Sequence, residues 1–363
     1  MIQGVLGDQD GLRYRCGRER TWAWFSPHRT PALGRRWQTS FLMALCLAAI
    51  LMGTPRLSAA GNENDRFNRW LTGLRQEALS QGIAESLLDQ VLKGLRPSER
   101  VIELDRNQAE FRMSFDRYLE LVAPSSRVAE GRMRLEENRA LLQEIAGRYG
   151  VQPEIIVALW GIESDFGRRM GDFPVVGSLA TLAFDGRRAR FFRGELLDAL
   201  RILHDGEIKP GLMVGSWAGA TGQCQFMPSS FRRYAVDYNG DGRRDIWEDR
   251  GDILASIANY LSRQGWLENE PWGQEVTLPG TFDHRLLGKN HRMALAEWEQ
   301  MGVTPFGGGF FPRLGGSVSL IQPAGPGGLV FAVYNNWHTL MKWNQSIFFA
   351  TAVGYLANRI RGR

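Results

Sequence analysis

The sequence predicts a mostly helical α+β protein, and three observations lead to that fold class. Apolar residues recur at helical spacing through residues 63–150 and again from about 150 to 265. Short runs rich in Val, Ile and Leu lie within residues 271–334, and residues 302–328 among them hold nine glycines and four prolines. An aromatic-rich helix is expected from 344 to 359. The expected architecture is a helical protein with a small β insertion near its C-terminal end.

The elements can be placed in order along the chain. Ser125 precedes a segment rich in Glu, Arg and Leu and marks the start of a helix. Two glycine-rich turns interrupt the helical pattern between 150 and 265. Three β-rich runs predict strands at Glu275–Leu278, Ser317–Ile321 and Leu329–Tyr334.

The composition is that of an ordinary globular chain. Of its 363 residues, 44% are apolar and 23% are charged, which excludes a disordered protein, a fibre and a polytopic membrane protein. Three cysteines cannot form a disulfide framework. The formal net charge of +5 would suggest nucleic acid or an anionic surface as partner if it were spread over the whole chain.

The excess positive charge instead lies in residues 1–60, which hold eight arginines and three acidic residues. Arg35 and Arg36 precede an apolar run from Phe41 to Gly53, and Ser58-Ala-Ala60 follows it. A basic region, an apolar stretch too short to span a bilayer and a small-residue site form a secretory signal, with a buried core helix as the alternative. We predict export to the periplasm of a Gram-negative bacterium. Cys46 follows a leucine inside the apolar run, so lipidation is not expected.

The chain without residues 1–60 has 36 basic and 36 acidic residues, so it is formally neutral. A nucleic-acid partner is therefore not expected. The mature chain is expected to have no transmembrane segment and to be a monomer. Cys224 is its single cysteine, which excludes an intrachain disulfide.

One carboxylate stands on the apolar helix predicted for residues 153–167. Pro153 fits the first helical position and Gly167 is placed to end the helix. Glu163 follows Leu159 by four residues and therefore lies on the apolar side. Burial disfavours the charged form of a carboxyl, which suits a general acid working near neutral pH. The structural alternative is a buried glutamate paired with one of four nearby arginines, at positions 168, 169, 187 and 188.

A glycine-rich segment, residues 215–230, offers the parts of a ligand site. Three glycines fall within its first eight residues, and such density lets a ligand approach the backbone closely. Ser216 and Gln225 offer hydrogen bonds, whereas Trp217 and Phe226 offer flat surfaces. These parts suit a sugar chain, whose faces are apolar and whose edges are polar. The alternative is a tight connector followed by a helix near Ser229.

The sequence lacks the motifs of several other kinds of site, which bind phosphate, dinucleotides or zinc or carry a nucleophilic serine. The sequence contains no G-x-x-x-x-G-K-[ST], no G-x-G-x-x-G after a strand, no G-x-S-x-G elbow and no H-E-x-x-H. No organic cofactor and no catalytic zinc are therefore expected.

The segment Asp237–Glu248 fits the calcium-loop pattern D-x-[DN]-x-[DN]-G-x₅-E in full. Its candidate ligands are the side chains of Asp237, Asn239, Asp241 and Glu248 and the carbonyl of Arg243. A single loop in an exported protein predicts structural Ca²⁺, and the alternative is a polar surface turn without metal.

Together these motifs make residues 63–363 resemble the lytic murein transglycosylase B family, which is glycoside hydrolase family 103. The resemblance is carried by Pro153–Gly167, Gly215–Ser230, Asp237–Glu248 and Lys342–Ser346. It implies cleavage of the β-1,4 bond between N-acetylmuramic acid and N-acetylglucosamine in peptidoglycan, with release of a 1,6-anhydromuramoyl product. Partners in wall synthesis are a further expectation.

The resemblance also implies roles for individual residues. Glu163 becomes the single catalytic acid and base. The metal ligands become Asp237, Asn239, Asp241 and Asp252, whereas the generic loop pattern would use Glu248. Phe191 and Trp343 stand where some members have tyrosine. The expected substrate-binding residues are Tyr118, Arg187, Arg188, Ser216, Gln225, Phe226, Trp343 and Asn344.

The implied domain organisation has five parts. These are a signal region (1–60), a helical domain (61–150), a lysozyme-like catalytic core (151–270) with an EF-hand-like loop (237–252), a small β subdomain (271–335), and a C-terminal helix that completes the core (336–363). Two other functions are compatible with the motifs: a lysozyme-type hydrolase, and a non-catalytic wall-binding protein stabilised by calcium.

Overall fold

The computed structural model describes residues 56–107 and 113–362. The export signal predicted for residues 1–60 therefore falls almost entirely outside the described residues. The chain divides into two compact units, Leu6–Arg66 and a unit that contains Phe67–Arg363. Helix α1 begins in the first unit, and all later elements belong to the second.

Within the described residues, six helices precede the predicted catalytic helix, and α5 begins at Ser125 as expected. Two of them start at serine caps: the hydroxyls of Ser98 and Ser114 accept hydrogen bonds from the backbone N–H groups of Val101 and Arg117. The six are α1 (Arg56–Ser80), α2 (Glu85–Leu92), α3 (Glu99–Arg106), α4 (Phe115–Val122), α5 (Ser125–Glu137) and α6 (Arg139–Tyr149).

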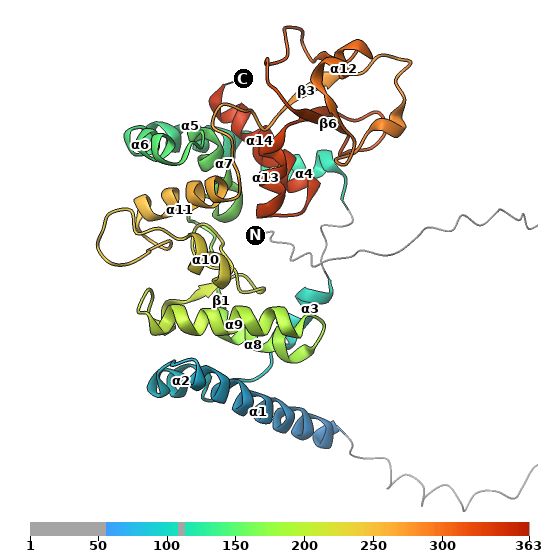
Figure 1. Cartoon of the computed structure of the whole chain (residues 1–363). Coiled ribbons are helices and arrows are strands. Elements are labelled where there is room, and N and C mark those ends of the chain that lie inside the picture. Colours follow the sequence, from blue (N-terminus) through green and yellow to red (C-terminus); the bar gives the residue numbers. More distant parts are fainter. Residues whose placement is uncertain (1–55, 108–112, 363) are drawn as a thin grey trace, which may run out of the picture. The chain divides into compact units, whose positions relative to one another are not determined.

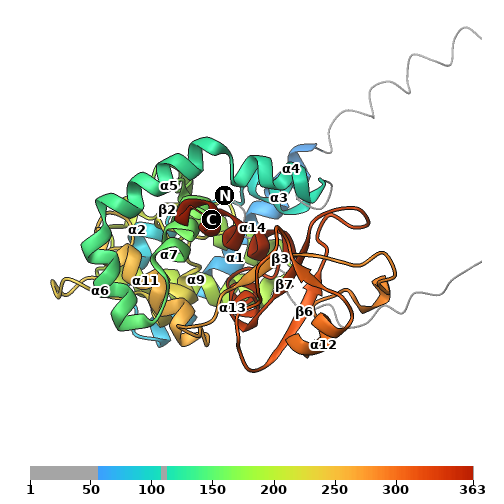
Figure 2. The ribbon, with the colours of Figure 1, turned by 90° about the horizontal axis from the view of Figure 1, so that it is seen from above.

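The central helix is α7 (Pro153–Ser164), in which every residue from Ile155 to Ser164 is buried. It packs against α5, α11 and α14, and Figure 2 shows α7 among these three helices. The remaining helices of this part are α8 (Val175–Asp185), α9 (Ala189–His204), α10 (Pro228–Tyr234), α11 (Arg250–Arg263), α13 (Asn335–Trp343) and α14 (Ile347–Arg361), with short 3₁₀ turns at Pro210–Leu212 and His284–Leu286.

Helix α7 ends earlier than the sequence predicts. Asp165 and Phe166 adopt left-handed backbone angles, with φ of 53° and 58°, before Gly167 is reached. The Asp165 carboxylate is held by Arg127 and Arg168 at 3.3 and 3.1 Å, and these ion pairs hold the reversed chain in place. Glu163 consequently lies in the last turn of the helix.

The helix expected from 344 to 359 is α14, but the C-terminal part expected as one helix over 336–363 contains two helices in the structure. Helix α13 ends at Trp343, and α14 begins only at Ile347. The Ser346 hydroxyl accepts a hydrogen bond from the N–H of Phe349 and so caps α14. The break places Trp343 at the end of a helix instead of inside one.

The β insertion forms a five-stranded antiparallel sheet in the order β4-β6-β7-β3-β5. Figure 1 shows the sheet with the short helix α12 (Leu295–Gln300) beside it. The sequence predicts β3, β6 and β7 but misses the two edge strands, which have only two or three residues and no alternation to detect. The strands are β3 (Gly273–Thr277), β4 (Arg292–Ala294), β5 (Thr304–Pro305), β6 (Ser317–Ile321) and β7 (Val330–Val333), and a separate pair is formed by β1 (Phe173–Pro174) and β2 (Val214–Gly215).

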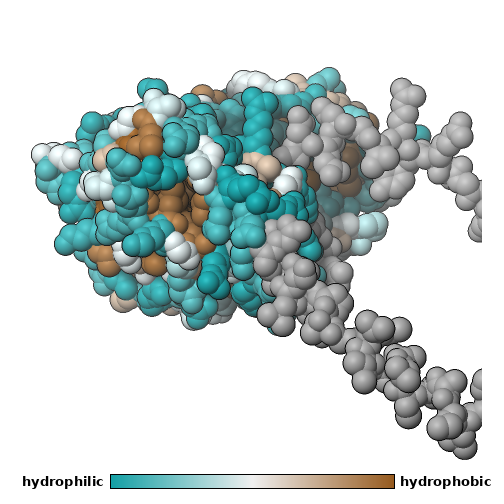
Figure 3. All heavy atoms as spheres, turned by 90° about the horizontal axis from the view of Figure 1, so that it is seen from below, coloured by the Kyte–Doolittle hydropathy of each residue, from teal (hydrophilic) through white to brown (hydrophobic). Residues whose placement is uncertain are grey.

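The described residues contain two clusters of buried apolar side chains. The larger cluster runs from Phe67 to Ile360 and includes residues of the segment 61–150, so that segment shares its core with α7 and α14. The smaller cluster lies in the β insertion, between Val276 and Tyr334. The outer face is mostly hydrophilic with apolar side chains gathered in a few places, as Figure 3 shows for one side.

Candidate active site

Glu163, the predicted catalytic residue, is deeply buried, with 1% of its surface exposed. The indole N–H of Trp343 donates a hydrogen bond of 2.6 Å to its Oε1 atom. Trp343 lies at the end of α13, whereas Glu163 lies at the end of α7. The ends of two helices far apart in sequence therefore meet at one carboxyl group.

The indole of Trp343 is held in place by two other rings. The ring centres of Phe226 and Tyr260 lie 5.3 and 4.7 Å from it, and the Tyr260 hydroxyl donates to the Lys342 carbonyl at 2.7 Å. With 2% of its surface exposed, Phe226 packs beneath Trp343, and its contact with substrate stays a prediction. The sequence indicates Trp343 as a substrate residue but not its bond to Glu163, because only the fold brings the two together.

The arginines that could have paired with Glu163 are found beside other carboxylates. Arg168 bonds Asp165 and Glu130, at 3.1 and 3.0 Å. Arg187 and Arg188 both donate to Asp105. Asp165 is thus engaged on the outer side of α7, as the sequence expected from its different helix face.

Asp105 is a functional candidate that the sequence did not reveal. It is 3% exposed, and its Oδ1 atom accepts hydrogen bonds from Arg187 at 2.8 Å and from Arg188 at 2.6 Å. The Arg188 guanidinium also lies over the ring of Phe192, at 4.8 Å. One carboxylate at the end of α3 therefore positions both predicted substrate-binding arginines. No local motif marks an aspartate for this task.

The glycine-rich segment folds as a tight loop whose shape depends on Gly222. Its φ is +70°, and a Cβ atom there would lie 2.6 Å from the Ile246 side chain. The Ser216 hydroxyl accepts a hydrogen bond from the N–H of Ala220 at 3.0 Å. The Gln225 side-chain amide donates to the Met170 carbonyl at 2.9 Å. Both predicted binding residues of the loop therefore also have hydrogen-bond partners within the protein.

Tyr118 and Asn344 lie on the side of the core formed by α4 and the start of α14. The Tyr118 ring contacts Phe348, with ring centres 5.7 Å apart. Asn344 accepts a hydrogen bond from the N–H of Ser346 at 3.0 Å. Phe348 also lines a groove of 590 Å³ between α14 and the β insertion, which adds Lys289 and His284 to its wall. The ring of Phe348 therefore lies between Tyr118 and this groove.

Cys224 is buried beside the site, and its thiol is unreactive. Burial raises the pKa of its thiol well above the usual range, and the negative charges of Glu163 and Asp252 add to the rise. Its Sγ atom donates to the Ile253 carbonyl at 3.4 Å. The thiol therefore stays protonated at neutral pH and acts as a small packing group.

The predicted calcium loop has the backbone that its pattern requires. Gly242 adopts φ of +90° at the sharp turn. The Asp237 carboxylate accepts hydrogen bonds from the N–H groups of Gly240 and Gly242, at 2.7 and 2.8 Å. The Asp241 carboxylate accepts one from the N–H of Arg243 at 2.9 Å. Oxygen atoms of the kind that Ca²⁺ prefers thus line the loop.

The two candidates for the last ligand differ in their surroundings. Asp252 is buried and accepts hydrogen bonds from the N–H groups of Tyr238 and Asp245 at 2.7 and 2.6 Å, whereas Glu248 is exposed. Within the described residues, no three acidic, histidine or cysteine side chains converge as a metal ion would require. The donor chemistry of the loop fits Ca²⁺, but its carboxylates bond backbone N–H groups.

The chain is similar to known proteins in both sequence and structure. Residues 66–358 match the sequence family described as transglycosylase SLT domain. The chain is also similar to the membrane-bound lytic murein transglycosylase B of Escherichia coli (strain K12), with 36% identity over 221 residues. That alignment covers 58% of this chain and 58% of the relative, so the chain spans little more than half of the curated protein it matches.

Solved structures show the same fold. The crystal structure of SltB3 from Pseudomonas aeruginosa in complex with NAG-anhNAM-pentapeptide has 44% identity and a TM-score of 0.79, over 82% of this chain and 80% of that one. The Escherichia coli lytic transglycosylase Slt35 in complex with calcium has 29% identity and a TM-score of 0.70, over 82% and 93%. The family match spans nearly all of the described residues, and this chain therefore belongs to the transglycosylase SLT domain family.

Proposed function

We propose that this chain is a lytic transglycosylase that cleaves the β-1,4 bond between N-acetylmuramic acid and N-acetylglucosamine in peptidoglycan. The observation that supports it most strongly is the buried Glu163 carboxyl, fixed by the Trp343 N–H at 2.6 Å. A buried carboxyl that is held in one orientation has the properties of a general acid and base. SltB3, at 44% identity, is crystallised with an anhydro-sugar ligand, which agrees with the proposed product.

Glu163 would act twice in the reaction. The protonated carboxyl gives its proton to the glycosidic oxygen, the C–O bond breaks, and the N-acetylglucosamine 4-hydroxyl leaves. The resulting carboxylate then removes the proton from the muramoyl C6 hydroxyl, whose oxygen attacks C1 and closes the 1,6-anhydro ring. Glu163 is protonated again at the end, and no water is consumed.

The substrate would supply what a second carboxylate supplies in ordinary glycosidases, which use two. Asp165, the nearest acidic residue in sequence, is held by Arg127 and Arg168 on the outer side of α7. The N-acetyl group of the substrate would therefore stabilise the positive charge that develops at C1, as in substrate-assisted families.

Mass spectrometry of digested peptidoglycan sacculi tests the proposed function. A transglycosylase releases anhydromuramoyl products, which are lighter by one water than the products of a hydrolase. Hydrolysed muropeptides would establish the lysozyme-type alternative instead. Binding to sacculi without any released product would establish a non-catalytic wall-binding protein.

We expect Asp105→Asn to raise KM by about tenfold and to change kcat little. The substitution removes the charge that holds Arg187 and Arg188, so both guanidinium groups lose their fixed positions. The loss of stability should be smaller than the about 3–5 kcal/mol typical of breaking a fully buried ion pair, because the Arg187 side chain is half exposed. Steady-state kinetics on soluble glycan fragments measures the KM effect, and urea unfolding measures the stability effect.

A matched control is Asp185→Asn, which removes an ion pair with Arg106 in the same region but leaves Asp105 intact. It should leave KM unchanged. An equal rise of KM in both variants would show that general loss of stability, not the position of the two arginines, weakens substrate binding.

We also propose that the Asp237–Glu248 loop holds a structural Ca²⁺. Side-chain oxygens of Asp237, Asn239 and Asp241 and the Arg243 carbonyl would bind it. Loops of this kind outside the cytosol bind Ca²⁺ with Kd of about 10⁻⁴–10⁻³ M. Addition of 10 mM Ca²⁺ should therefore stabilise the folded state by about 1–3 kcal/mol and raise Tm by a few degrees.

Three variants identify the ligands of that ion. Asp237→Ala combined with Asp241→Ala should abolish the Ca²⁺-dependent rise in Tm. Glu248→Gln should abolish it if the generic loop pattern holds, and Asp252→Asn if the family's ligand set holds. An equal rise in wild type and in the double variant would rule out binding at this loop.

The chain is proposed to be exported to the periplasm without lipidation at Cys46. None of the helices within residues 56–107 and 113–362 is long and apolar enough to cross a membrane. Peptide mapping of the protein made in cells should find an N-terminus at Gly61. A mature chain that retains residues before Arg35 would contradict the proposed signal.

A further inference from the structure

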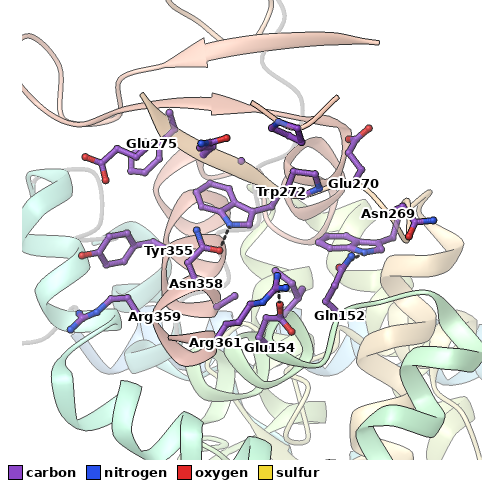
Figure 4. A pocket seen from close by; sticks show the side chains of 18 of the residues that line it. Gln152, Glu154, Asn269, Glu270, Trp272, Glu275, Tyr355, Asn358, Arg359 and Arg361 are labelled. Carbon is purple, nitrogen blue, oxygen red and sulfur yellow. Dashed lines mark hydrogen bonds and ion pairs between the residues drawn. The ribbon is translucent and has the colours of Figure 1, made fainter. Parts of the chain in front are cut away.

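A cavity of 810 Å³ lies between the sheet and the C-terminal half of α14, and Figure 4 shows it from close by. Glu154, in the first turn of α7, lines it, whereas Glu163 lies in the last turn of the same helix. At 1.5 Å per residue, the backbone positions of these two residues are separated by about 13.5 Å along the helix axis. The cavity is therefore at the opposite end of the catalytic helix and is distinct from the Glu163 site.

The rim of the cavity carries aromatic rings that are open to solvent. Phe306 is 63% exposed and Phe310 is 95% exposed, the largest value among the large apolar side chains that the structure describes. Gly307–Gly309, between them, all adopt positive φ values of 75°, 88° and 95°, which glycine adopts readily and other residues rarely do. The ring of Tyr355 faces the cavity from α14. Solvent-exposed phenylalanines beside a cavity are typical of a binding surface.

Two tryptophans form a rigid inner wall. The indole N–H of Trp266 donates to Gln152 Oε1 at 2.9 Å, and that of Trp272 donates to Asn358 Oδ1 at 3.2 Å. These bonds fix both rings and orient both amides toward the protein. The wall is therefore formed before any ligand binds, which reduces the entropy lost on binding.

The cavity is lined by more acidic than basic residues. The charged lining residues are Glu154, Glu268, Glu270, Glu275, Arg359 and Arg361. Glu154 is paired with Arg361 at 3.3 Å, and Glu270 accepts hydrogen bonds from the backbone of Asn335. The Glu275 carboxylate has no hydrogen-bond or ion-pair partner within the described residues, and partial burial raises its pKa.

The excess of acidic residues in the lining favours one part of the wall polymer over another as the ligand. Peptide stems carry several carboxylates, which the acidic lining would repel. The glycan backbone is neutral, has apolar faces that can lie on aromatic rings, and carries hydroxyl and N-acetyl N–H groups that can donate hydrogen bonds. An acceptor without a protein partner, such as Glu275, complements a ligand rich in donors.

We propose that this cavity is a second carbohydrate-binding site, which takes a neutral N-acetylated segment of a glycan strand. Phe310 and Tyr355 receive the sugar faces, and Glu275 accepts from hydroxyl or amide N–H groups. The proposal rests on the proposed function, because it takes the bound strand to belong to the polymer that Glu163 cleaves. Its role is to retain the enzyme on long strands, with no part in the chemistry at the scissile bond.

The first experiment locates the binding of a neutral probe. Full-length Glu163→Gln protein is mixed with chitohexaose, an uncharged N-acetylglucosamine oligomer, and amide hydrogen exchange is followed. Slower exchange is expected in segments 269–275 and 306–312, apart from any change near the catalytic loop at 215–226. Unchanged exchange in both cavity segments at saturating chitohexaose would overturn the proposal.

The second experiment separates long from short substrates. Phe310→Ser, Glu275→Gln and Tyr355→Ser are each compared with Met301→Ser, which changes a 42% exposed side chain of the β insertion that does not line the cavity. In the Glu163→Gln background, each cavity variant should reduce retention on sacculi at least fivefold. With Glu163 intact, kcat/KM on a soluble fragment of two disaccharide units should equal that of the wild type.

The possible results are distinguishable from one another. Cavity variants that bind sacculi as tightly as Met301→Ser would overturn the second site. Protection of 306–312 by glycan-free stem peptide, and not by chitohexaose, would also overturn it and assign the cavity to peptide. If the wild type releases no anhydro product while chitohexaose still protects 306–312, the proposed function fails and the carbohydrate site stands.

Discussion

Glu163→Gln is expected to lower kcat by about a thousandfold or more, because general acid and base catalysis contributes about 10²–10⁴-fold and Glu163 is proposed to perform both steps. Glutamine has nearly the same shape, and its carbonyl oxygen can still accept the Trp343 N–H. The amide cannot release a proton to the glycosidic oxygen or remove one from the C6 hydroxyl. Release of soluble fragments from sacculi, measured over time, gives the rate.

The matched control is Glu120→Gln, which neutralises an exposed glutamate on α4 that pairs with Arg117. Surface ion pairs of this kind contribute about 0–1 kcal/mol, so its turnover and Tm should match those of the wild type. Glu163→Gln protein should keep its binding to sacculi. Turnover within tenfold of the wild type would show that another group protonates the leaving oxygen.

Trp343→Phe is expected to lower kcat by about 10- to 100-fold and to change KM little. The substitution keeps an aromatic ring beside Phe226 and Tyr260 but removes the indole N–H that donates to Glu163 Oε1. Loss of a hydrogen bond to a buried acceptor costs a free energy of about 1–3 kcal/mol. If this cost raises the activation barrier, it corresponds to the expected decrease in kcat of about 10- to 100-fold. A decrease in kcat without a change in KM would identify Trp343 as a residue that positions Glu163.

Trp343→Tyr is the conservative comparison, since a phenol hydroxyl can donate where an indole N–H did. It should recover part of the lost kcat, whereas a purely structural role would give both variants the same loss in proportion to Tm. Thermal unfolding of both proteins supplies that correction. Equal kcat values in wild type and Trp343→Phe would exclude any contribution of the 2.6 Å hydrogen bond.

Helix α7 could be predicted because its signals are local. Pro153 at its start and the apolar residues around Glu163 mark both the helix and its burial, and the structure confirms both. The end of the helix was predicted wrongly, because Arg127, far away in sequence, holds Asp165 in a left-handed conformation. Local patterns carry no information about such a distant partner.

The parts of the site that escaped prediction all depend on long-range contacts. Asp105 lies on a short helix without any recognisable motif. Its role is visible only in the folded structure, where it forms ion pairs with Arg187 and Arg188. The strands β4 and β5 are too short to show alternation. Trp343 was singled out by a resemblance, but its N–H bond to Glu163 spans 180 residues of sequence.

That long span has a consequence for when the protein becomes active. A ribosome makes Glu163 well before α13 and α14, yet α7 has its donor and a main packing partner in those two last helices. A nascent chain that ends before Asn335 therefore lacks the Trp343 N–H that donates to Glu163 in the complete protein. If Glu163 is the proposed catalytic acid, the enzyme gains its activity only after the last two helices have been synthesised and have folded against α7.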